Sequence, residues 1–187
     1  KMILSMSILV AIKAEKLAIL NFLTMIISLD LKLSQSRKFS MDKTNEAFVK
    51  EAETWIGTKW RHGQVLKGDS TDCIQWLIYL GREFGWVPKN FIAPKYSRDW
   101  ALHNKESALK KGISQFCNEV KEMQIGDILL FQFGKTGSHA GVYCGDGLMI
   151  HAHIKNGVEK IKLTQYCNKT ERYIDVLESI WRPRTYG

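Results

Sequence analysis

Apolar residues recur at steps of three and four in the stretch that begins at residue 73. The positions are Cys73, Leu77, Leu80 and Phe84, and this spacing is typical of the buried face of an amphipathic helix. Asp72, or Thr71 before it, is suited to cap the helix, because a short side chain with an oxygen accepts hydrogen bonds from the unpaired amides of a first turn. The pattern therefore predicts a helix that begins at Cys73 and ends near Gly85.

Two further helices are predicted on either side of this one. Asp42 or Thr44 is suited to cap the first, which ends at Gly57 and has a buried face of Phe48, Ala52, Trp55 and Ile56. The spacing of Leu109, Ile113 and Phe116 predicts the second. Between them, prolines mark an extended connection, and Ser97 is suited to cap a short turn through Trp100.

After residue 127 the pattern changes to short apolar and alternating runs separated by glycines. Such runs are typical of strands joined by tight turns. We expect strands at residues 128–133, 138–144, 148–154, 158–163 and 173–181. Helices followed by a meander of strands predict an α+β domain, with N-terminal helices packed on a C-terminal antiparallel β-sheet.

The first forty residues have a different pattern. Apolar runs at residues 2–12 and 17–29 flank Lys13, Glu15 and Lys16. Each run is shorter than the roughly 18 residues of a membrane span, and no A-x-A-like cleavage site follows. Three interpretations stay open: an export or anchor segment, a helix packed on the domain, and translated sequence upstream of a start at Met41. We therefore expect an N-terminal extension at residues 1–40 and one domain at residues 41–187.

The charge of the chain narrows the classes of partner. The formal net charge of +8 over 187 residues favours anionic partners such as nucleic acid, acidic membrane or bacterial wall polymer. The sequence has no basic block, no aromatic-interleaved basic stripe and no zinc-finger spacing, so no nucleic acid partner is expected. Membrane contact is expected only if residues 1–40 are an anchor. The four cysteines lack the paired spacing of a disulfide framework and are expected to be free thiols.

Three histidines fall on two neighbouring predicted strands. If residues 145–147 form a three-residue hairpin loop, Cys144 pairs with Leu148. His139 then lies opposite His153, with His151 diagonal to it on the same face. A helix carrying Cys73 and packed on that face would bring the thiol to the imidazoles.

This arrangement is sufficient for acyl transfer. Cys73 would be the nucleophile, with its pKa lowered by the helix N-terminus, and its backbone N–H would serve an oxyanion. His139 would be the base and His151 the orienting third member, with His153 as the alternative. A zinc site from His151, His153 and either His139 or Cys73 is the weaker hypothesis, because an H-x-H pair alone is a weak signal. We expect no metal and no other cofactor.

At these residues the sequence resembles the NlpC-type family of papain-like cell-wall peptidases. The landmarks are residues 55–58 (WIGT), Asp72-Cys73, 126–131 (GDILLF), 138–143 (SHAGVY) and 149–152 (MIHA), and the match covers roughly residues 45–183. Residues 96–100 and the loop around His62 most resemble the branch encoded by bacteriophages and gene transfer agents.

The resemblance implies a papain-like fold and a hydrolase that cleaves stem peptides of peptidoglycan, commonly between γ-D-glutamate and a diamino acid. By position, Cys73, His139 and His151 correspond to the family's nucleophile, base and third member. Residues expected to line the substrate site are Trp60, His62, Asp72, Ile74 and Gln75. Trp60 stands where the family often has tyrosine, and Ile74-Gln75 replaces a small Ser-Gly pair. Because of these differences, the sequence does not decide which bond is cleaved.

The partners implied are peptidoglycan and, for the phage branch, tail proteins, and the location implied is the cell envelope, the exterior or a virion. Two other functions stay open. One is an acyltransferase or amidase acting on lipids or small amides with the same thiol chemistry. The other is a non-catalytic wall-binding or virion module held to anionic polymer by the +8 charge.

Overall fold

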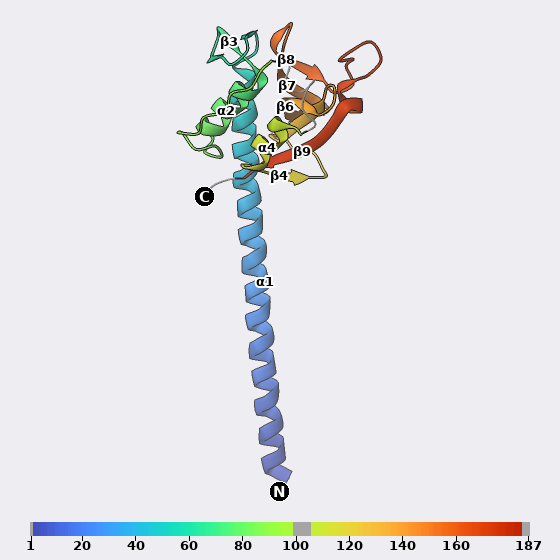
Figure 1. Cartoon of the computed structure of the whole chain (residues 1–187). Coiled ribbons are helices and arrows are strands. Elements are labelled where there is room, and N and C mark those ends of the chain that lie inside the picture. Colours follow the sequence, from blue (N-terminus) through green and yellow to red (C-terminus); the bar gives the residue numbers. More distant parts are fainter. Residues whose placement is uncertain (1, 99–105, 185–187) are drawn as a thin grey trace. The chain divides into compact units, whose positions relative to one another are not determined.

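The computed structural model describes residues 2–98 and 106–184, and the chain divides into two units, residues 1–43 and 44–187. Each unit is described by itself. Helix α1 runs over Met2–Glu53 (Figure 1). The prediction that a helix begins at Asp42 or Thr44 is wrong, because both residues lie inside α1, where a polar side chain is tolerated. The predicted domain boundary and the three interpretations of residues 1–40 stay predictions.

The described side chains of the first unit include many large apolar ones that are exposed, such as Leu20 and Phe22. Within the described residues, no helix combines the length and the apolar character that crossing a bilayer demands.

The second unit is built on a six-stranded antiparallel sheet of order β4-β9-β5-β6-β7-β8. The strands are β4 Cys117–Val120, β5 Ile128–Gln132, β6 Gly137–Gly145, β7 Leu148–His153, β8 Gly157–Lys162 and β9 Leu177–Pro183. The predicted α+β class is confirmed. The sequence did not predict β4, and the last strand begins later than expected, because Tyr173–Val176 forms the 3-10 helix η1.

Two short helices accompany the sheet. Helix α2 spans Cys73–Glu83 and is capped by Asp72 as predicted, since this side chain accepts hydrogen bonds from the amides of Ile74 and Gln75. Helix α4 spans Ala108–Ser114, close to the predicted element. The predicted turn from Ser97 to Trp100 lies partly outside the described residues. The loop before α2, for which no strands were predicted, contains a small sheet of β1 Lys59–Trp60, β2 Val65–Leu66 and β3 Ser70–Thr71.

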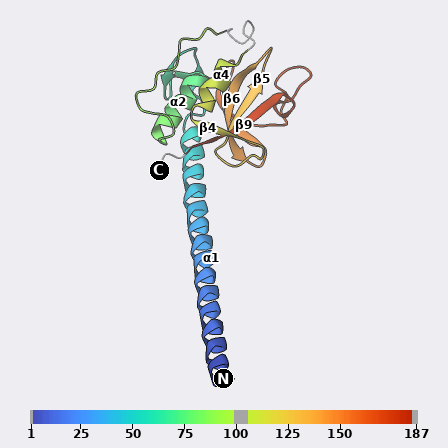
Figure 2. The same ribbon diagram turned by 60° about the horizontal axis from the view of Figure 1, so that its bottom comes forward.

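The large sheet has a separate apolar cluster on each face. One face packs against α2 and α4 through residues such as Leu130, Ala140 and Ile150 (Figure 2). The other face carries Phe131 and Met149 and is packed by Tyr173 of η1. Because neighbouring residues of a strand point to opposite faces, the strands contribute alternate side chains to the two clusters.

The hairpin of β6 and β7 has the predicted register with a different turn. Gly141 pairs with His151 and Tyr143 with Met149, as expected. The turn itself has two residues, because Asp146 and Gly147 adopt positive φ angles of 51° and 70°. Gly145 therefore pairs with Leu148, and the extra residue Cys144 is absorbed as a bulge.

A close backbone contact joins β8 to the segment before β1. The Gly57 N–H donates to Val158 O at 2.9 Å, and the Val158 N–H donates to Thr58 O at 2.8 Å. Gly157 has φ +78°, and a Cβ there would lie 2.2 Å from Thr58 O. Only glycine fits at this crossing, which holds the histidine-bearing strands against the chain that leads to Cys73.

Candidate active site

Cys73 and His139 line the same cavity, whose volume is about 770 Å³. Cys73 is on the first turn of α2 and 9% exposed. Of the residues expected to line a substrate site, the cavity wall contains Trp60, His62, Asp72 and Ile74. Gln75 instead contacts the wall residue Tyr96 through its side-chain amide. The fold therefore brings the predicted nucleophile, the predicted base and most of the predicted lining residues to one place.

The thiol and the histidines come to the cavity from different faces of the sheet, which differs from the prediction. Helix α2 packs on the sheet face of Ala140 and Ile150, whereas His139 contacts Phe131 of the opposite face. The expectation that the helix would pack on the histidine face is wrong. The sulfur approaches the strand at its backbone, where the N–H of Ala140 is a hydrogen-bond donor for the Cys73 thiolate. This amide belongs to the residue next to His139.

His139 and His151 are directly hydrogen-bonded, with 2.7 Å between His139 Nε2 and His151 Nδ1. This contact leaves Nδ1 of His139 as the ring nitrogen available to a thiol. His151 is fully buried, and the Tyr173 ring packs edge-on against it at 5.0 Å. His153 lies beside His151, with 5.6 Å between ring centroids. His151, rather than the alternative His153, therefore makes the contact that a third member requires.

The thiol and the imidazole are both neutral at rest. Burial, followed by the charge of Asp72, raises the pKa of Cys73 to about 12. Burial, followed by the proximity of His153, lowers the pKa of His139 to about 3. The expectation that the helix N-terminus lowers the thiol pKa is wrong, because the loss of hydration outweighs the hydrogen bonds from the amides of Ala140, Cys73 and Ile74.

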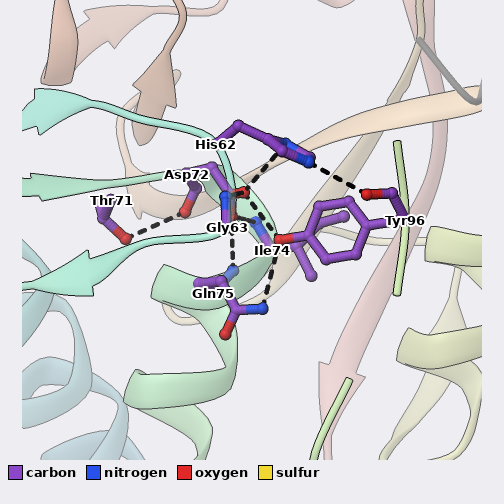
Figure 3. A network of polar contacts seen from close by, with 7 residues as sticks. All are labelled: His62, Gly63, Thr71, Asp72, Ile74, Gln75 and Tyr96. Atoms are coloured by element: carbon purple, nitrogen blue, oxygen red, sulfur yellow. Dashed lines mark hydrogen bonds and ion pairs between the residues drawn. The ribbon is translucent and has the colours of Figure 1, made fainter. Parts of the chain in front are cut away.

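The carboxylate of Asp72 organises the wall of the cavity (Figure 3). Its Oδ1 accepts from the amides of Ile74 at 3.1 Å and Gln75 at 2.8 Å. Its Oδ2 accepts from the Gly63 N–H and the Tyr96 O–H, both at 2.7 Å. Asp72 is 3% exposed, so these four donors replace water around a buried charge. The acidic side chain before Cys73 thus joins α2 to two loops.

Tyr96 lines the cavity, although the sequence analysis named it only as part of the 96–100 landmark and not as a lining residue. Burial and Asp72 raise the pKa of its phenol, which therefore stays protonated and donates. His62 holds the same segment, with 3.1 Å between its Nε2 and Tyr96 O. Trp60 offers no phenol, but Tyr96 supplies one from another part of the chain. Nothing in the apolar pattern marks Tyr96, because it lies in a connection without periodicity.

Glu159 is a second residue that the sequence analysis missed. It pairs directly opposite His151 across β7 and β8. Its Oε1 lies 3.4 Å from His151 Nε2. The dipeptide Asn156-Gly157 was the available signal, because a tight turn there pairs His153 with Gly157 and so places Glu159 beside His151. In residues 2–98 and 106–184, no group of three or more His, Cys, Asp or Glu side chains is arranged to hold a metal ion.

Comparison with known proteins places the chain in a family. The sequence model of the NlpC/P60 family matches residues 57–186. A search of curated protein sequences found no match.

Solved structures share the fold. An NlpC/P60 family protein from Bacillus cereus has a TM-score of 0.51 and 18% identity, covering 76% of this chain and 40% of its own. A protein described as similar to a lipoprotein of the NLP/P60 family, from Staphylococcus aureus, has a TM-score of 0.52 and 18% identity, covering 76% of this chain and 42% of its own. The peptidoglycan hydrolase RipB from Mycobacterium tuberculosis has a TM-score of 0.46 and 16% identity, covering 75% of this chain and 64% of its own.

The matched region thus spans about two fifths of the Bacillus and Staphylococcus proteins. The family match covers more than two thirds of the chain and includes Cys73, His139 and His151. The chain therefore belongs to the NlpC/P60 family.

Proposed function

We propose that the protein is a cell-wall peptidase that cleaves stem peptides of peptidoglycan with Cys73 as nucleophile. The observation that supports this most is that Cys73 and His139 line one cavity, with the buried His151 hydrogen-bonded to His139 behind it, in a chain of this family. The scissile bond that we propose joins γ-D-glutamate to a diamino acid.

The reaction begins from the neutral pair. As Cys73 Sγ attacks the carbonyl carbon, its proton passes to Nδ1 of His139, and the oxyanion is met by the Cys73 backbone N–H. The tetrahedral intermediate collapses to a thioester, and the leaving amine takes the proton from His139. Water then attacks the thioester and gives a proton to His139; the C–S bond breaks, the departing sulfur takes that proton back as the thiol, and the acid product leaves as the carboxylate after losing its proton to solvent. His151 holds the other nitrogen of His139 throughout.

Mass spectrometry of purified sacculi incubated with the protein tests this proposal. New fragments with free amine termini are expected, and their masses identify the bond. Cys73→Ala should abolish them. The matched control is Cys167→Ala, since Cys167 lines the same cavity. Its Sγ donates to Glu171 O, so this variant should still release the fragments. EDTA should have no effect. Undiminished turnover in Cys73→Ala would remove the proposal.

The same experiment separates the alternatives. Acyl groups transferred to an acceptor other than water would indicate an acyltransferase. Salt-sensitive binding to sacculi that survives Cys73→Ala, without new amine termini, would indicate a wall-binding module held by the +8 charge.

We further propose that the protein acts in the cell envelope or at a phage tail tip, on the resemblance of residues 96–100 and the His62 loop to the phage branch. Detection of the chain in purified virions of its source, rather than in washed envelopes, would support the tail location. Its presence in envelopes alone would contradict it.

A further inference from the structure

The carboxylate of Glu159 faces two imidazoles. Its Oε1 lies 3.4 Å from His151 Nε2 and 3.6 Å from His153 Nδ1. Asn156 Nδ2 donates to both carboxylate oxygens, at 2.9 and 3.1 Å, and so holds the side chain in place. The Glu159 side chain is 24% exposed, whereas His151 is fully buried. The carboxylate therefore connects the buried imidazole to solvent.

His151 Nε2 is a buried polar atom without a hydrogen-bond partner in the described part of the chain. A nitrogen removed from water without a partner is costly, and such atoms in native structures usually mark a function or a contact that tightens. At 3.4 Å the Glu159 oxygen is just beyond ordinary hydrogen-bond length. The carboxylate is therefore close enough to act on this nitrogen through its charge.

The hydrogen bond between the two buried imidazoles allows two proton arrangements. In the first, His151 carries its proton on Nε2, facing Glu159, and its Nδ1 accepts from the Nε2–H of His139. Nδ1 of His139 is then unprotonated and can take a proton from Cys73. In the second, His151 carries its proton on Nδ1 and donates to His139, whose Nδ1 then bears a proton and cannot act as a base.

We propose that Glu159 is a positioning residue that selects the first arrangement. A carboxylate attracts an N–H and repels a nitrogen lone pair, so it favours the His151 tautomer that is protonated on Nε2. Nδ1 of His151 must then accept the 2.7 Å hydrogen bond from His139 Nε2, so the tautomer of His139 is fixed as well. Glu159 thus sets the base beside Cys73 without touching substrate.

The charge of Glu159 has a second effect during the reaction, which rests on the proposed function. When His139 takes the thiol proton, a positive charge appears in a buried site. The Glu159 carboxylate, on the far side of His151 from His139, is a negative group that stabilises that charge. Replacing it with an amide keeps an oxygen acceptor for His151 but removes the charge, so the two effects can be separated.

Nitrogen-15 NMR of the histidine rings reads the tautomers directly. The full chain has five histidines, which single His→Gln variants assign. We expect His139 and His151 both to carry the proton on Nε2 in the wild type and in Glu159→Gln. In Glu159→Ala, His151 should shift toward protonation on Nδ1, and His139 should follow. The control is Glu119→Ala, an exposed residue of β4, which should leave both rings unchanged.

Two results overturn the proposal: His151 protonated on Nδ1 in the wild type, or unchanged tautomers in Glu159→Ala. If only His153 responds, Glu159 serves that ring instead and the proposal is wrong. The tautomer readout does not depend on turnover, and circular dichroism of each variant checks that it is folded.

Kinetics on a muropeptide substrate complete the test. In Glu159→Ala we expect kcat to fall about 100-fold, the range of general base catalysis, with KM unchanged. Glu159→Gln should lose less, because it keeps the tautomer and lacks only the charge. An unchanged kcat in both variants would refute the positioning role. Expected tautomers without any hydrolysis by the wild type would refute the proposed function and leave the tautomer assignment intact.

Discussion

The four-donor environment of Asp72 makes this residue the most sensitive single position in the wall of the cavity. In Asp72→Ala the amides of Ile74 and Gln75 lose their cap, which costs about 1 kcal/mol. The Gly63 N–H and the Tyr96 O–H also lose their acceptor, at about 1 kcal/mol each. The free energy of unfolding should therefore fall by about 3 kcal/mol, which for a domain of this size lowers Tm by about 9 °C.

Asp72→Asn is the matched variant, because it keeps one oxygen for the cap but presents an NH₂ group to the Gly63 N–H. Its Tm should fall by about a third as much as that of Asp72→Ala, as measured by calorimetry. A second readout is the rate at which iodoacetamide alkylates the peptide containing Cys73, followed against pH. Since the Asp72 charge raises the pKa of this thiol, the alkylation profile of Asp72→Asn should move to lower pH. Equal melting of the three proteins would refute the reasoning.

Three further predictions concern other contacts. Tyr96→Phe removes a hydrogen bond to a buried carboxylate and should lower stability in urea titrations by about 2 kcal/mol; a change near zero would contradict this. The pKa values of His139 and His151 are lowered by burial to about 3 and about 2, so the unfolded chain binds protons below pH 6.5 that the folded chain does not. The free energy of unfolding should be at its full value above pH 6.5, and below pH 6.5 each of the two rings should lower it by about 1.4 kcal/mol per pH unit. His151→Gln should halve that slope, and equal slopes in the variant and the wild type would refute the assignment. Arg182 donates two hydrogen bonds of 2.9 Å to the buried carboxylate of Asp127, so Arg182→Met leaves that charge without its partner and should lower the free energy of unfolding by about 3 kcal/mol, measured by calorimetry. Adding Asp127→Asn should recover part of this loss, and no recovery in the double variant would contradict the explanation.

Local signals predicted the elements of the second unit that carry the site. The apolar stripe and the cap at Asp72 depend on residues within a few positions of one another, so the start of α2 could be read from the sequence. The alternation of β6 and β7 and their short connection fixed the register that joins His139 to His151.

Features that depend on distant parts of the chain were missed. Strand β4 pairs with β9, which lies sixty or more positions further along the chain, and β4 carries little pattern of its own. Tyr96 reaches Asp72 from a connection with no periodic pattern, across 24 positions. The direction of the Cys73 pKa depends on how completely the thiol is buried, which only the packed structure determines. The position of Cys73 on the helix could therefore be predicted from the sequence, but its ionisation state could not.

The buried, protonated state of Cys73 has a consequence for chemical durability. Peroxides attack thiolates and barely react with thiols, and the products beyond sulfenic acid are irreversible. With its pKa raised to about 12, the sulfur presents almost no thiolate at neutral pH. We therefore expect Cys73 of the resting protein to resist oxidation by peroxide without an added reductant.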